Sequence, residues 1–469
     1  MVKTIFGTCG IRRKFTDEFS GPEWLRIGMA IGTYLGKRST VLIGRDTRQT
    51  AELVQYAIMS GLLSCGCEVI MLHGSTESPY VTTPTVAYST KHFKADAGIQ
   101  VTASHNTPEY IGIKIWQPTG MGFTPAQEEA IDEIYTRQSF QLAKWSDVQK
   151  VKTITNANDI HIEAILQKIK APLKFDEKLT VVADPGNGSA CEIAPKLLQR
   201  LGVNVVTINS QPDGLFPGRD SEPNRENIKT LLKMVKNDDD LHVGIAFDGD
   251  ADRVRFIDGN GNLIDADRII LLFAKRFVNT SKGSPSIVTP VNSSTILEDT
   301  LNPIGIDVYR TKIGDINVAI KIQEKKGTLG GEISGTYTWP EFHLGPDSFL
   351  SAAYMLQIMA ESGPLEKLME DVPQYHVIRI NMEIKEEIFH DLNFSEVESI
   401  ASSYFKENDI EILEVIDIDG LLIRFDQGFF LVRKSGTSPA IRLTCEHRDG
   451  TKASEILERI KNRVKELAR

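Results

Sequence analysis

The sequence predicts an α/β protein built from several domains. Its 469 residues exceed the size at which one hydrophobic core stops growing, and a length of roughly 150 residues per domain indicates three or four domains. Short apolar runs of β character alternate with segments of helical periodicity over most of the chain. A strand, a small polar turn and a helix also follow one another several times, as in layered α/β folds.

The predicted elements near the N-terminus show this order. A helix is predicted first, because apolar residues recur at helical spacing. These residues are Trp24, Ile27, Ile31 and Leu35. A strand at 41–44 then ends at the polar turn 45–48, and a helix follows at 51–65. The same arrangement recurs at 179–189 and 287–294, which indicates repeated α/β units.

The C-terminal part has a different pattern. Beyond residue 371, strand-like runs at 421–425 and 429–432 lie close together, and a final amphipathic helix follows. Its apolar residues are Ile456, Leu457, Ile460, Val464 and Leu467. This pattern predicts a smaller α+β domain. Polar stretches at 149–158 and 361–371 and a break at 258–261 are predicted linkers, so the predicted domains are 1–150, 151–257, 258–370 and 371–469.

Composition narrows the functional class. The chain has a formal charge of −10, no basic stripe, no apolar run near the ~18 residues that cross a bilayer, and no signal peptide in its first residues. We therefore expect a cytoplasmic protein that binds neither nucleic acid nor membrane. Five scattered cysteines fit neither a disulfide framework nor a zinc site, and we expect reduced thiols.

The strongest chemical signal is the segment 247–253, Phe-Asp-Gly-Asp-Ala-Asp-Arg. Asp248, Asp250 and Asp252 alternate with two of the smallest residues, so their oxygens can converge on one hard cation. An EF-hand is excluded because Arg253 and Gly259 stand where its glycine and bidentate glutamate belong. The alternative is an exposed acidic turn. Arg253 favours a site shared by a metal and an anion such as phosphate.

A second signal lies at 102–108, where Ser104 and His105 are followed by Lys114. A serine hydroxyl is a weak nucleophile unless a base, a metal or cations assist it, so this group is a candidate phosphoryl-transfer site. Taken alone, the segment is more typical of a structural turn.

Two further loops carry polar groups. Residues 433–439, Arg-Lys-Ser-Gly-Thr-Ser-Pro, follow an apolar strand and could bind a phosphate dianion through cations, hydroxyls and close backbone approach. The glycine-rich loop 330–335 contains Glu332 and Ser334, which could bind vicinal sugar hydroxyls. Each loop taken alone is also compatible with a simple turn.

The four segments follow one another in the chain as 102–108, 247–253, 330–335 and 433–439. With them in this order, the sequence resembles the α-D-phosphohexomutase superfamily, and most closely its phosphomannomutase/phosphoglucomutase-like members. The resemblance covers essentially the whole chain. It includes the opening segment 6–12 (FGTCGIR), Gly44-Arg45-Asp46, and 212–217 (PDGLFP).

The resemblance implies three related mixed-sheet α/β domains plus a smaller C-terminal α+β domain around a central cleft. It implies that Ser104 is phosphorylated and that Ser104, Asp248, Asp250 and Asp252 hold Mg²⁺. The reacting centre would be lined by Arg12, His105, Lys114 and Arg253. The sugar would be bound by Glu332 and Ser334, and the non-reacting phosphate by Arg433, Ser435, Gly436 and Thr437.

The implied reaction interconverts a hexose 1-phosphate and a hexose 6-phosphate. Phosphorylated Ser104 gives its phosphoryl group to the sugar phosphate, and the hexose 1,6-bisphosphate turns end for end and phosphorylates Ser104 again. Lys114 and His105 are candidates for proton transfer. A hinge of the last domain could let the intermediate reorient. The implied partners are small-molecule sugar phosphates, and the implied assembly is a monomer or homodimer.

The sequence departs from the family pattern at several positions. These are Arg13, Thr107, Ile111, Thr336 and Ser438. Thr336 matters most, because a sugar-contacting histidine is usual there; His343 is a nearby candidate to supply the imidazole.

Four functions therefore stay open. Mannose or glucose phosphates are the first expectation, and phosphoglucosamine mutase is the alternative, differing mainly at residues 332–336. A Mg²⁺-dependent phosphatase with an aspartyl nucleophile at Asp248 or Asp250, and a non-catalytic sugar-phosphate-binding protein, are the others.

Overall fold

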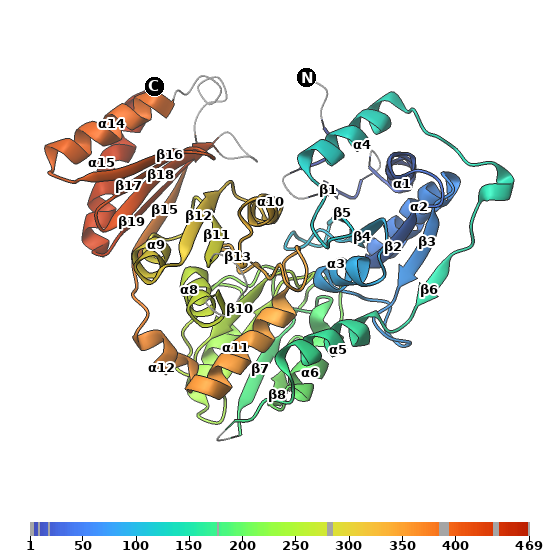
Figure 1. Cartoon of the computed structure of the whole chain (residues 1–469), viewed down its shortest axis with the longest axis horizontal. Coiled ribbons are helices and arrows are strands. Elements are labelled where there is room, and N and C mark those ends of the chain that lie inside the picture. Colours follow the sequence, from blue (N-terminus) through green and yellow to red (C-terminus); the bar gives the residue numbers. More distant parts are fainter. Residues whose placement is uncertain are drawn as a thin grey trace. The chain divides into compact units, whose positions relative to one another are not determined.

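The computed structural model describes residues 4–7, 10–16, 19–175, 178–278, 285–383, 394–434 and 440–467 (Figure 1). The chain forms two compact units. The first comprises Met1–Ile264 and Ser334–Met369, and the second comprises Asp265–Ile333 and Glu370–Arg469. Each unit contains two sheets with their helices.

The first sheet of the first unit is mixed and has the order β1-β5-β4-β2-β3-β6. Strands β2, β3, β4 and β6 run parallel, and β5 and β1 are added antiparallel. The strands are β1 (Ile11–Lys14), β2 (Thr40–Arg45), β3 (Glu68–Leu72), β4 (Ala97–Val101), β5 (Tyr110–Trp116) and β6 (Lys152–Ile154). The helices before β6 are α1 (Gly21–Leu35), α2 (Ala51–Ser64), α3 (Thr83–His92) and α4 (Pro125–Arg137).

Both faces of this sheet are covered because its strands are apolar throughout. Val41 and Ile43 pack with residues of α1, α2 and α4, whereas Leu42 between them packs with residues of α3. This alternation follows from the period of two in a strand. A parallel sheet buried on both faces is expected to carry such unbroken apolar strands.

The second sheet has the order β10-β9-β7-β8, with β9 and β7 parallel and β10 antiparallel to β9. Its strands are β7 (Thr180–Asp184), β8 (Asn204–Thr207), β9 (Val243–Phe247) and β10 (Val254–Ile257). The remaining helices of this unit are α5 (Ala157–Ile169), α6 (Ala190–Arg200), α7 (Lys229–Asn237), α11 (Ser348–Ser362) and α12 (Leu365–Glu370). The loop joining β9 to β10 carries the acidic motif.

The second unit begins with a parallel arrangement of β11 between β12 and β13. These strands are β11 (Ser286–Pro290), β12 (Asp307–Thr311) and β13 (Leu329–Gly331), and the helices are α8 (Ala266–Phe277), α9 (Ile296–Leu301) and α10 (Asp315–Lys325). The C-terminal part is an antiparallel sheet of order β15-β19-β18-β17-β16 with two helices. Its elements are β15 (His376–Glu383), α14 (Phe394–Glu407), β16 (Ile412–Asp417), β17 (Leu421–Phe425), β18 (Gly428–Lys434), β19 (Ala440–His447) and α15 (Gly450–Leu467).

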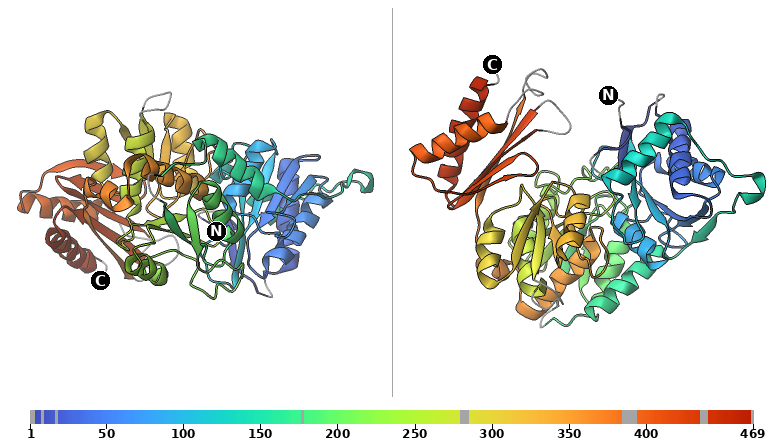
Figure 2. Two further views of the ribbon diagram at one scale, coloured as in Figure 1. Left: turned by 90° about the horizontal axis from the view of Figure 1, so that it is seen from below. Right: turned by 45° about the horizontal axis from the view of Figure 1, so that its top comes forward.

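Helices α14 and α15 cover one face of this antiparallel sheet (Figure 2). Alternate strand residues point to the opposite face, where Leu422, Phe429 and Leu431 form a small apolar cluster with Val291, which follows β11. The last domain is therefore packed on the preceding one within the second unit. The four-domain fold expected from the sequence, with three mixed-sheet α/β domains and a smaller C-terminal α+β domain, is confirmed.

Two of the three predicted linkers contain regular structure. Within 149–158, β6 pairs with β3 at the edge of the first sheet, and α5 begins at Ala157. Residues 361–371 contain the end of α11 and all of α12. The polar side chains of Lys152 and Thr153 are exposed to solvent because β6 is an edge strand.

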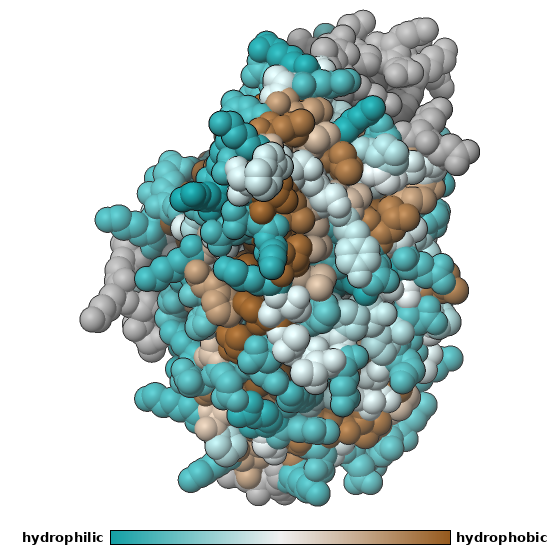
Figure 3. Space-filling view, turned by 90° about the vertical axis from the view of Figure 1, so that its right-hand side faces the viewer, coloured by the Kyte–Doolittle hydropathy of each residue, from teal (hydrophilic) through white to brown (hydrophobic). Residues whose placement is uncertain are grey.

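Large apolar side chains are exposed between α4 and β6. They are Leu142, Trp145, Val148 and Val151, and Trp145 is 91% exposed. Figure 3 views the molecule from the side of β3 and β6, where hydrophilic side chains surround small apolar groups. Among the described residues, no helix is long and apolar enough to cross a membrane. The described cysteines Cys65, Cys67, Cys191 and Cys445 are buried free thiols, as expected.

The buried carboxylate of Glu446 connects the C-terminal antiparallel sheet with the start of α9 within the second unit. Glu446 on β19 is fully buried, and its Oε1 accepts hydrogen bonds from the backbone N and the Oγ1 of Thr295 at 2.8 and 2.7 Å. Its Oε2 has no hydrogen-bond partner among the described residues. Burial raises the pKa of Glu446 to about 7, and the carboxylate of Asp267 contributes in the same direction.

We predict that the Glu446→Gln substitution flattens the pH dependence of stability of the second unit. Because the folded-state pKa is raised, the folded protein holds this proton more tightly, and stability falls as pH rises through about 7. The introduced glutamine would keep an acceptor for Thr295 but could not ionise. Thermal unfolding between pH 5.5 and 8.5 should show a smaller decrease for this variant, by roughly 1–3 kcal/mol at the alkaline end.

The matched control is Glu458→Gln, which removes an exposed carboxylate paired with Lys461. It should leave the pH dependence unchanged. An identical pH profile for the Glu446→Gln and natural proteins would show that Glu446 stays ionised throughout this range.

Candidate active site

The acidic motif forms the tight loop between β9 and β10. Asp248 and Asp250 are fully buried, Asp252 is 5% exposed, and one oxygen from each lies within 4.8 Å of the others. The loop is compact because Gly249 packs directly on Gly188, where an added Cβ would lie 2.5 Å from the Gly249 carbonyl oxygen. Ala251 has a left-handed φ of 58°, which is costly for a residue with a Cβ. The alternative of an exposed acidic turn is therefore wrong.

Lys114 partly compensates the three carboxylates. It lies on β5, and its buried Nζ donates to Oδ2 of Asp250 at 2.7 Å and to Oδ2 of Asp252. Burial alone would raise the pKa of Asp250, but the charge and hydrogen bond of Lys114 hold it below its usual range. Burial raises the pKa of Asp248 well above its ordinary value, and Asp252 and Asp250 raise it further. The loop therefore attracts additional positive charge.

Ser104 lies directly against this loop. Its Oγ donates to Oδ2 of Asp248 at 2.9 Å, although the two residues are 144 positions apart in the sequence. The side chain is 1% exposed, and its φ of 51° is again left-handed. Strained backbone at a buried polar residue is common at functional sites, where the surroundings must hold the conformation.

Arg48 holds the serine loop and was not identified from the sequence. Its guanidinium is fully buried and donates to Oδ2 of Asp46. It also donates to four backbone carbonyl oxygens, at distances of 2.6 to 3.1 Å, from Ser104, Asn106, Thr107 and Tyr110. The signal that could have found it is its place in the polar turn at the end of β2, because side chains at the carboxyl ends of neighbouring strands meet.

The imidazole of His105 and the guanidinium groups of Arg12 and Arg253 lie near Ser104. His105 Nδ1 lies 3.4 Å from Ser104 Oγ, and Arg253 forms an ion pair with Glu222. Burial lowers the pKa of His105 to about 2, and the charges of Arg253 and Arg12 contribute to this shift. His105 is therefore uncharged at neutral pH. Glu222 and Ser221, whose Oγ donates to the Ser104 carbonyl oxygen at 3.0 Å, were also missed from the sequence.

Arg12 lies on β1, next to β5, and its Nη1 donates to Oδ1 of Asn106 at 3.4 Å. The first unit thus gathers all five residues predicted to react or line the centre, together with the three predicted carboxylate ligands. Residues 8 and 9 of the opening motif lie outside the described residues.

The donor set fits a divalent cation. Oδ1 of Asp250 and Oδ1 of Asp252 are buried without a hydrogen-bond partner among the described residues. Leaving a carboxylate oxygen buried and unpaired is costly unless a cation or proton satisfies it. Oxygens from three carboxylates, with no nitrogen or sulfur ligand, are the donors that a hard cation such as Mg²⁺ prefers.

The predicted sugar-binding residues are divided between the two units. Ser334 belongs to the first unit, where its Oγ lies 3.3 Å from Thr336 Oγ1. Gly335 adopts a φ of 93°, and an added Cβ would lie 2.6 Å from the carbonyl oxygen of Val254. This close approach attaches the segment to β10. Glu332 belongs to the second unit, where its Oε1 accepts from the backbone N of Gly314 at 2.9 Å.

The suggestion that His343 supplies a sugar-contacting imidazole is wrong. Its side chain is fully buried, its Nε2 pairs with Asp347 Oδ2 at 2.9 Å, and its Nδ1 accepts from the backbone N of Gly345. Both ring nitrogens are therefore already used.

Of the predicted phosphate loop, Arg433 is described and forms an ion pair with Asp419 at 3.2 Å in the second unit. Ser435, Gly436, Thr437 and Ser438 lie outside the described residues. Asp419 also accepts from the backbone N of Ile313 at 3.2 Å. It therefore connects the strand pair β17 and β18 with the loop that contacts Glu332.

Comparison with known families matches the whole succession of domains. Residues 3–142, 159–261 and 265–375 match the alpha/beta/alpha domains I, II and III of phosphoglucomutase/phosphomannomutase. Residues 379–463 match the C-terminal domain of the same family.

Full-length relatives agree with this match. A probable phosphoglucosamine mutase of Methanosphaera stadtmanae is 38% identical over 466 residues, covering 98% of both chains. One from Pyrococcus abyssi is 37% identical over 461 residues, again covering 98% of both chains. A phosphoglucomutase/phosphomannomutase of Thermococcus kodakarensis is 36% identical over 462 residues and 97% of each chain.

Solved structures share the fold. A phosphoglucomutase/phosphomannomutase family protein from Burkholderia thailandensis superposes with a TM-score of 0.85 at 24% identity, covering 99% of this chain and 97% of the other. A phosphomannomutase-like protein from Thermus thermophilus gives a TM-score of 0.80 at 22% identity, covering 98% and 99%.

Four domain models match this chain in order, and its relatives align with it over nearly their full length. The structure adds a buried acidic loop beside a serine. The chain belongs to the phosphoglucomutase/phosphomannomutase family of the α-D-phosphohexomutase superfamily and is an isomerase of that class.

Proposed function

We propose that this isomerase is a phosphoglucosamine mutase, which interconverts glucosamine 6-phosphate and glucosamine 1-phosphate through a phosphorylated Ser104. The observation that carries the mechanism is the contact of Ser104 Oγ with Asp248 Oδ2, inside a buried group of carboxylates and cations. The site favours serine as phosphoryl carrier over an aspartyl nucleophile.

The proposed sugar rests on the relatives. The names of the Methanosphaera and Pyrococcus relatives favour glucosamine phosphate over the mannose and glucose phosphates first expected from the opening motif. Mannose or glucose phosphate is the second candidate, which the name of the Thermococcus kodakarensis relative supports at nearly the same identity.

In the proposed reaction, phosphorylated Ser104 transfers its phosphoryl group to the free hydroxyl of the sugar monophosphate. The O–P bond to Ser104 breaks and a bond to the sugar oxygen forms, giving a hexosamine 1,6-bisphosphate and a serine hydroxyl. After the bisphosphate reorients, Ser104 takes the other phosphoryl group and releases the isomeric monophosphate. One site serves both half-reactions.

The surrounding side chains have distinct roles in this proposal. The uncharged imidazole of His105, whose Nδ1 lies 3.4 Å from Ser104 Oγ, takes the proton of the attacking hydroxyl and passes it to the leaving Ser104 oxygen, which restores the serine hydroxyl. Lys114 stays protonated between Asp250 and Asp252 and offsets the charge that develops on the phosphoryl oxygens. Arg12 and Arg253 orient the phosphoryl group through their guanidinium N–H groups.

Mg²⁺ would be held by the three carboxylates of the acidic loop and by an oxygen of phosphorylated Ser104. The carboxylates are those of Asp248, of Asp250 through Oδ1 and of Asp252 through Oδ1. When bound, the ion supplies positive charge to the transferred phosphoryl group.

We further propose that Glu332 and Ser334 bind sugar hydroxyls, and that the non-reacting phosphate is gripped by Arg433 and the loop that follows it. The residues of that loop are Ser435, Gly436 and Thr437. Arg433 would exchange its ion pair with Asp419 for the phosphate, so binding would loosen the Asp419 contact.

The Ser104→Ala substitution should abolish turnover of every sugar phosphate by at least about 10³-fold, because the nucleophile is lost. The natural enzyme incubated with labelled hexosamine 1,6-bisphosphate should carry a phosphate that resists neutral hydroxylamine. The Ser104→Ala protein should carry none. The measurements are coupled turnover assays and intact-protein mass spectrometry.

A matched control is Ser64→Ala, which removes an exposed hydroxyl from α2 and should leave both readouts unchanged. A hydroxylamine-labile adduct that survives Ser104→Ala would instead support the phosphatase with an aspartyl nucleophile. Tight sugar-phosphate binding without turnover would support the binding protein.

The sugar is tested with glucosamine 1-phosphate, glucose 1-phosphate and mannose 1-phosphate, each with its matching bisphosphate. We expect kcat/KM for glucosamine 1-phosphate to exceed the others by about tenfold or more, because a site that hydrogen-bonds one polar substituent disfavours its replacement. A higher value for glucose or mannose phosphate would select the second candidate.

Removing divalent cations with a chelator should abolish turnover, because the carboxylates of the loop then repel one another without a bound cation and the phosphoryl group loses its counter-charge. Added Mg²⁺ should restore the activity in a saturable way, as measured by titration of the chelated enzyme. Full activity in excess chelator would contradict the proposed metal site.

A further inference from the structure

Asp250 is held by a residue that no sequence motif singled out. Thr83, the first residue of α3, donates its backbone N–H to the Asp250 carbonyl oxygen at 2.9 Å. Its Oγ1 also donates to Asp250 Oδ2 at 2.5 Å. The Thr83 side chain is fully buried, so water cannot take over this contact.

These contacts distinguish the two oxygens of Asp250. Oδ2 accepts from both Thr83 and Lys114, whereas Oδ1 is buried and unpaired among the described residues. The two oxygens of a carboxylate are chemically equivalent, so these bonds fix its orientation, and any partial rotation would weaken both of them. Thr83 and Lys114 together therefore keep Oδ1 directed toward the position that a cation would occupy.

A second helix holds the next residue of the acidic loop. Ser348, the first residue of α11, donates its Oγ to the carbonyl oxygen of Ala251 at 2.6 Å. Ala251 is the fully buried residue with the left-handed φ. The starts of α3 and α11 thus hold adjacent residues of one strained loop.

A buried network joins the two helix starts. His161 on α5 contacts Thr85 Oγ1 through Nδ1 at 3.1 Å and Asp347 Oδ2 through Nε2 at 2.9 Å. Asp347 caps α11, because its Oδ1 accepts from the backbone N–H groups of Phe349 and Leu350. The same Oδ2 accepts from His343.

This cluster of two histidines and an aspartate is not a metal site. His343 Nδ1 accepts a hydrogen bond from the backbone N of Gly345 at 3.1 Å, so its Nε2 carries the proton and cannot bind a metal. The cluster is instead a fully paired hydrogen-bond network that fixes α3, α5 and α11 relative to one another.

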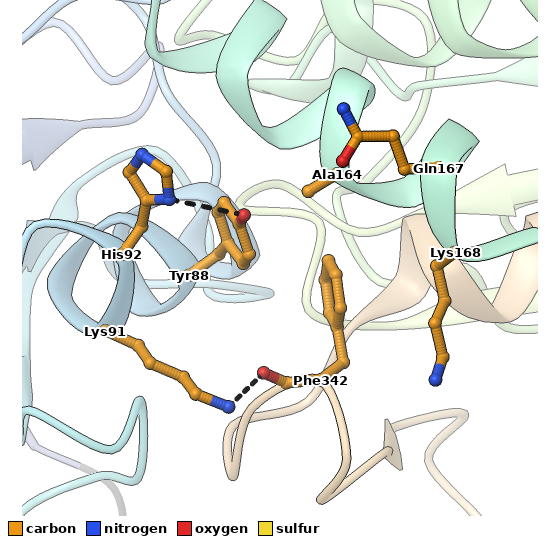
Figure 4. Close-up of a pocket in the computed structure, with 7 residues that line it drawn as sticks. All are labelled: Tyr88, Lys91, His92, Ala164, Gln167, Lys168 and Phe342. Atoms are coloured by element: carbon orange, nitrogen blue, oxygen red, sulfur yellow. Dashed lines mark hydrogen bonds between the residues drawn. The ribbon is translucent and has the colours of Figure 1, made fainter.

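Aromatic rings separate the network from a surface pocket of about 490 Å³ (Figure 4). Tyr88 stacks on His161 with ring centroids 5.1 Å apart and on Phe342 at 4.9 Å. Lys91 donates to the Phe342 carbonyl oxygen at 2.5 Å, which holds the Phe342 segment against α3. The buried hydrogen bonds of the His161–Asp347–His343 network are rigid, so they keep the starts of α3 and α11 in place.

From this geometry we propose that Thr83 is a positioning residue for the metal site: its hydroxyl fixes the orientation of the Asp250 carboxylate and so leaves the second oxygen, Oδ1, available as the ligand atom. The proposal rests on the proposed role of Asp250 in metal binding. Residues that orient metal ligands typically change affinity by about 10- to 100-fold when they are removed.

The test measures Mn²⁺ binding to the chelated, dephosphorylated protein by electron paramagnetic resonance, without any substrate. Thr83→Val keeps the shape and the backbone N–H but removes the hydroxyl, and we expect its Kd for Mn²⁺ to rise by about tenfold or more. Thr83→Ser restores the donor and should restore the affinity. With saturating Mg²⁺, kcat should recover substantially while KM for the sugar phosphate stays unchanged.

The matched control is Thr90→Val on the same helix, which removes a buried hydroxyl that donates to the Val86 carbonyl oxygen within its own helix. It should leave Mn²⁺ binding unchanged. If Thr83→Val does not fold, Thr83→Ala gives the same readout without an added branch.

Unchanged Mn²⁺ affinity in Thr83→Val or Thr83→Ala would overturn the proposal, as would equal losses in the Val and Ser variants. Asp250→Asn separates this outcome from failure of the proposed metal site. If Asp250→Asn loses Mn²⁺ and Thr83→Val does not, only the role of Thr83 is wrong. If neither variant loses Mn²⁺, the proposed metal site fails as well.

Discussion

The site depends on the burial of three carboxylates in one short loop. Each buried anion is costly, and three within 4.8 Å repel one another strongly unless cations lie close by. Lys114 supplies one positive charge from the first sheet and Arg253 another from the loop itself. Oδ1 of Asp250 and Oδ1 of Asp252 still lack a hydrogen-bond partner among the described residues, so the negative charge of the loop is only partly compensated.

The two loops of the site have strained backbone conformations, which hydrogen bonds from neighbouring elements stabilise. Ser104 and Ala251 both adopt left-handed backbone conformations, and each is fixed by hydrogen bonds to its carbonyl oxygen. Arg48 holds the serine loop, and Ser348 holds the acidic loop. Neither loop could keep its conformation as an isolated peptide, because the stabilising donors come from other elements. The reactive geometry is therefore a property of the packed unit.

Much of the fold and of the site's composition could be read from the sequence. Helical spacing located α1, and the strand-turn-helix pattern located β2 and α2, because burial imposes those periods on the side chains. Polar composition did not predict β6, because this edge strand exposes its side chains to water. The interpretation of His343 failed because spacing along the chain does not show that both of its nitrogens are used inside the core.

The sequence alone determined which chemical groups are present: the three aspartates at alternate positions, the serine with its neighbouring histidine and lysine, and the order of the domains. Local patterns carry this information because secondary structure and short loops depend on adjacent residues. Only the tertiary structure decided that Arg48 braces the serine loop, that Thr83 and Lys114 share one oxygen of Asp250, and that Oδ1 is left unpaired among the residues described. Those contacts join residues tens to hundreds of positions apart, and their geometry arises when separate strands and helices pack together.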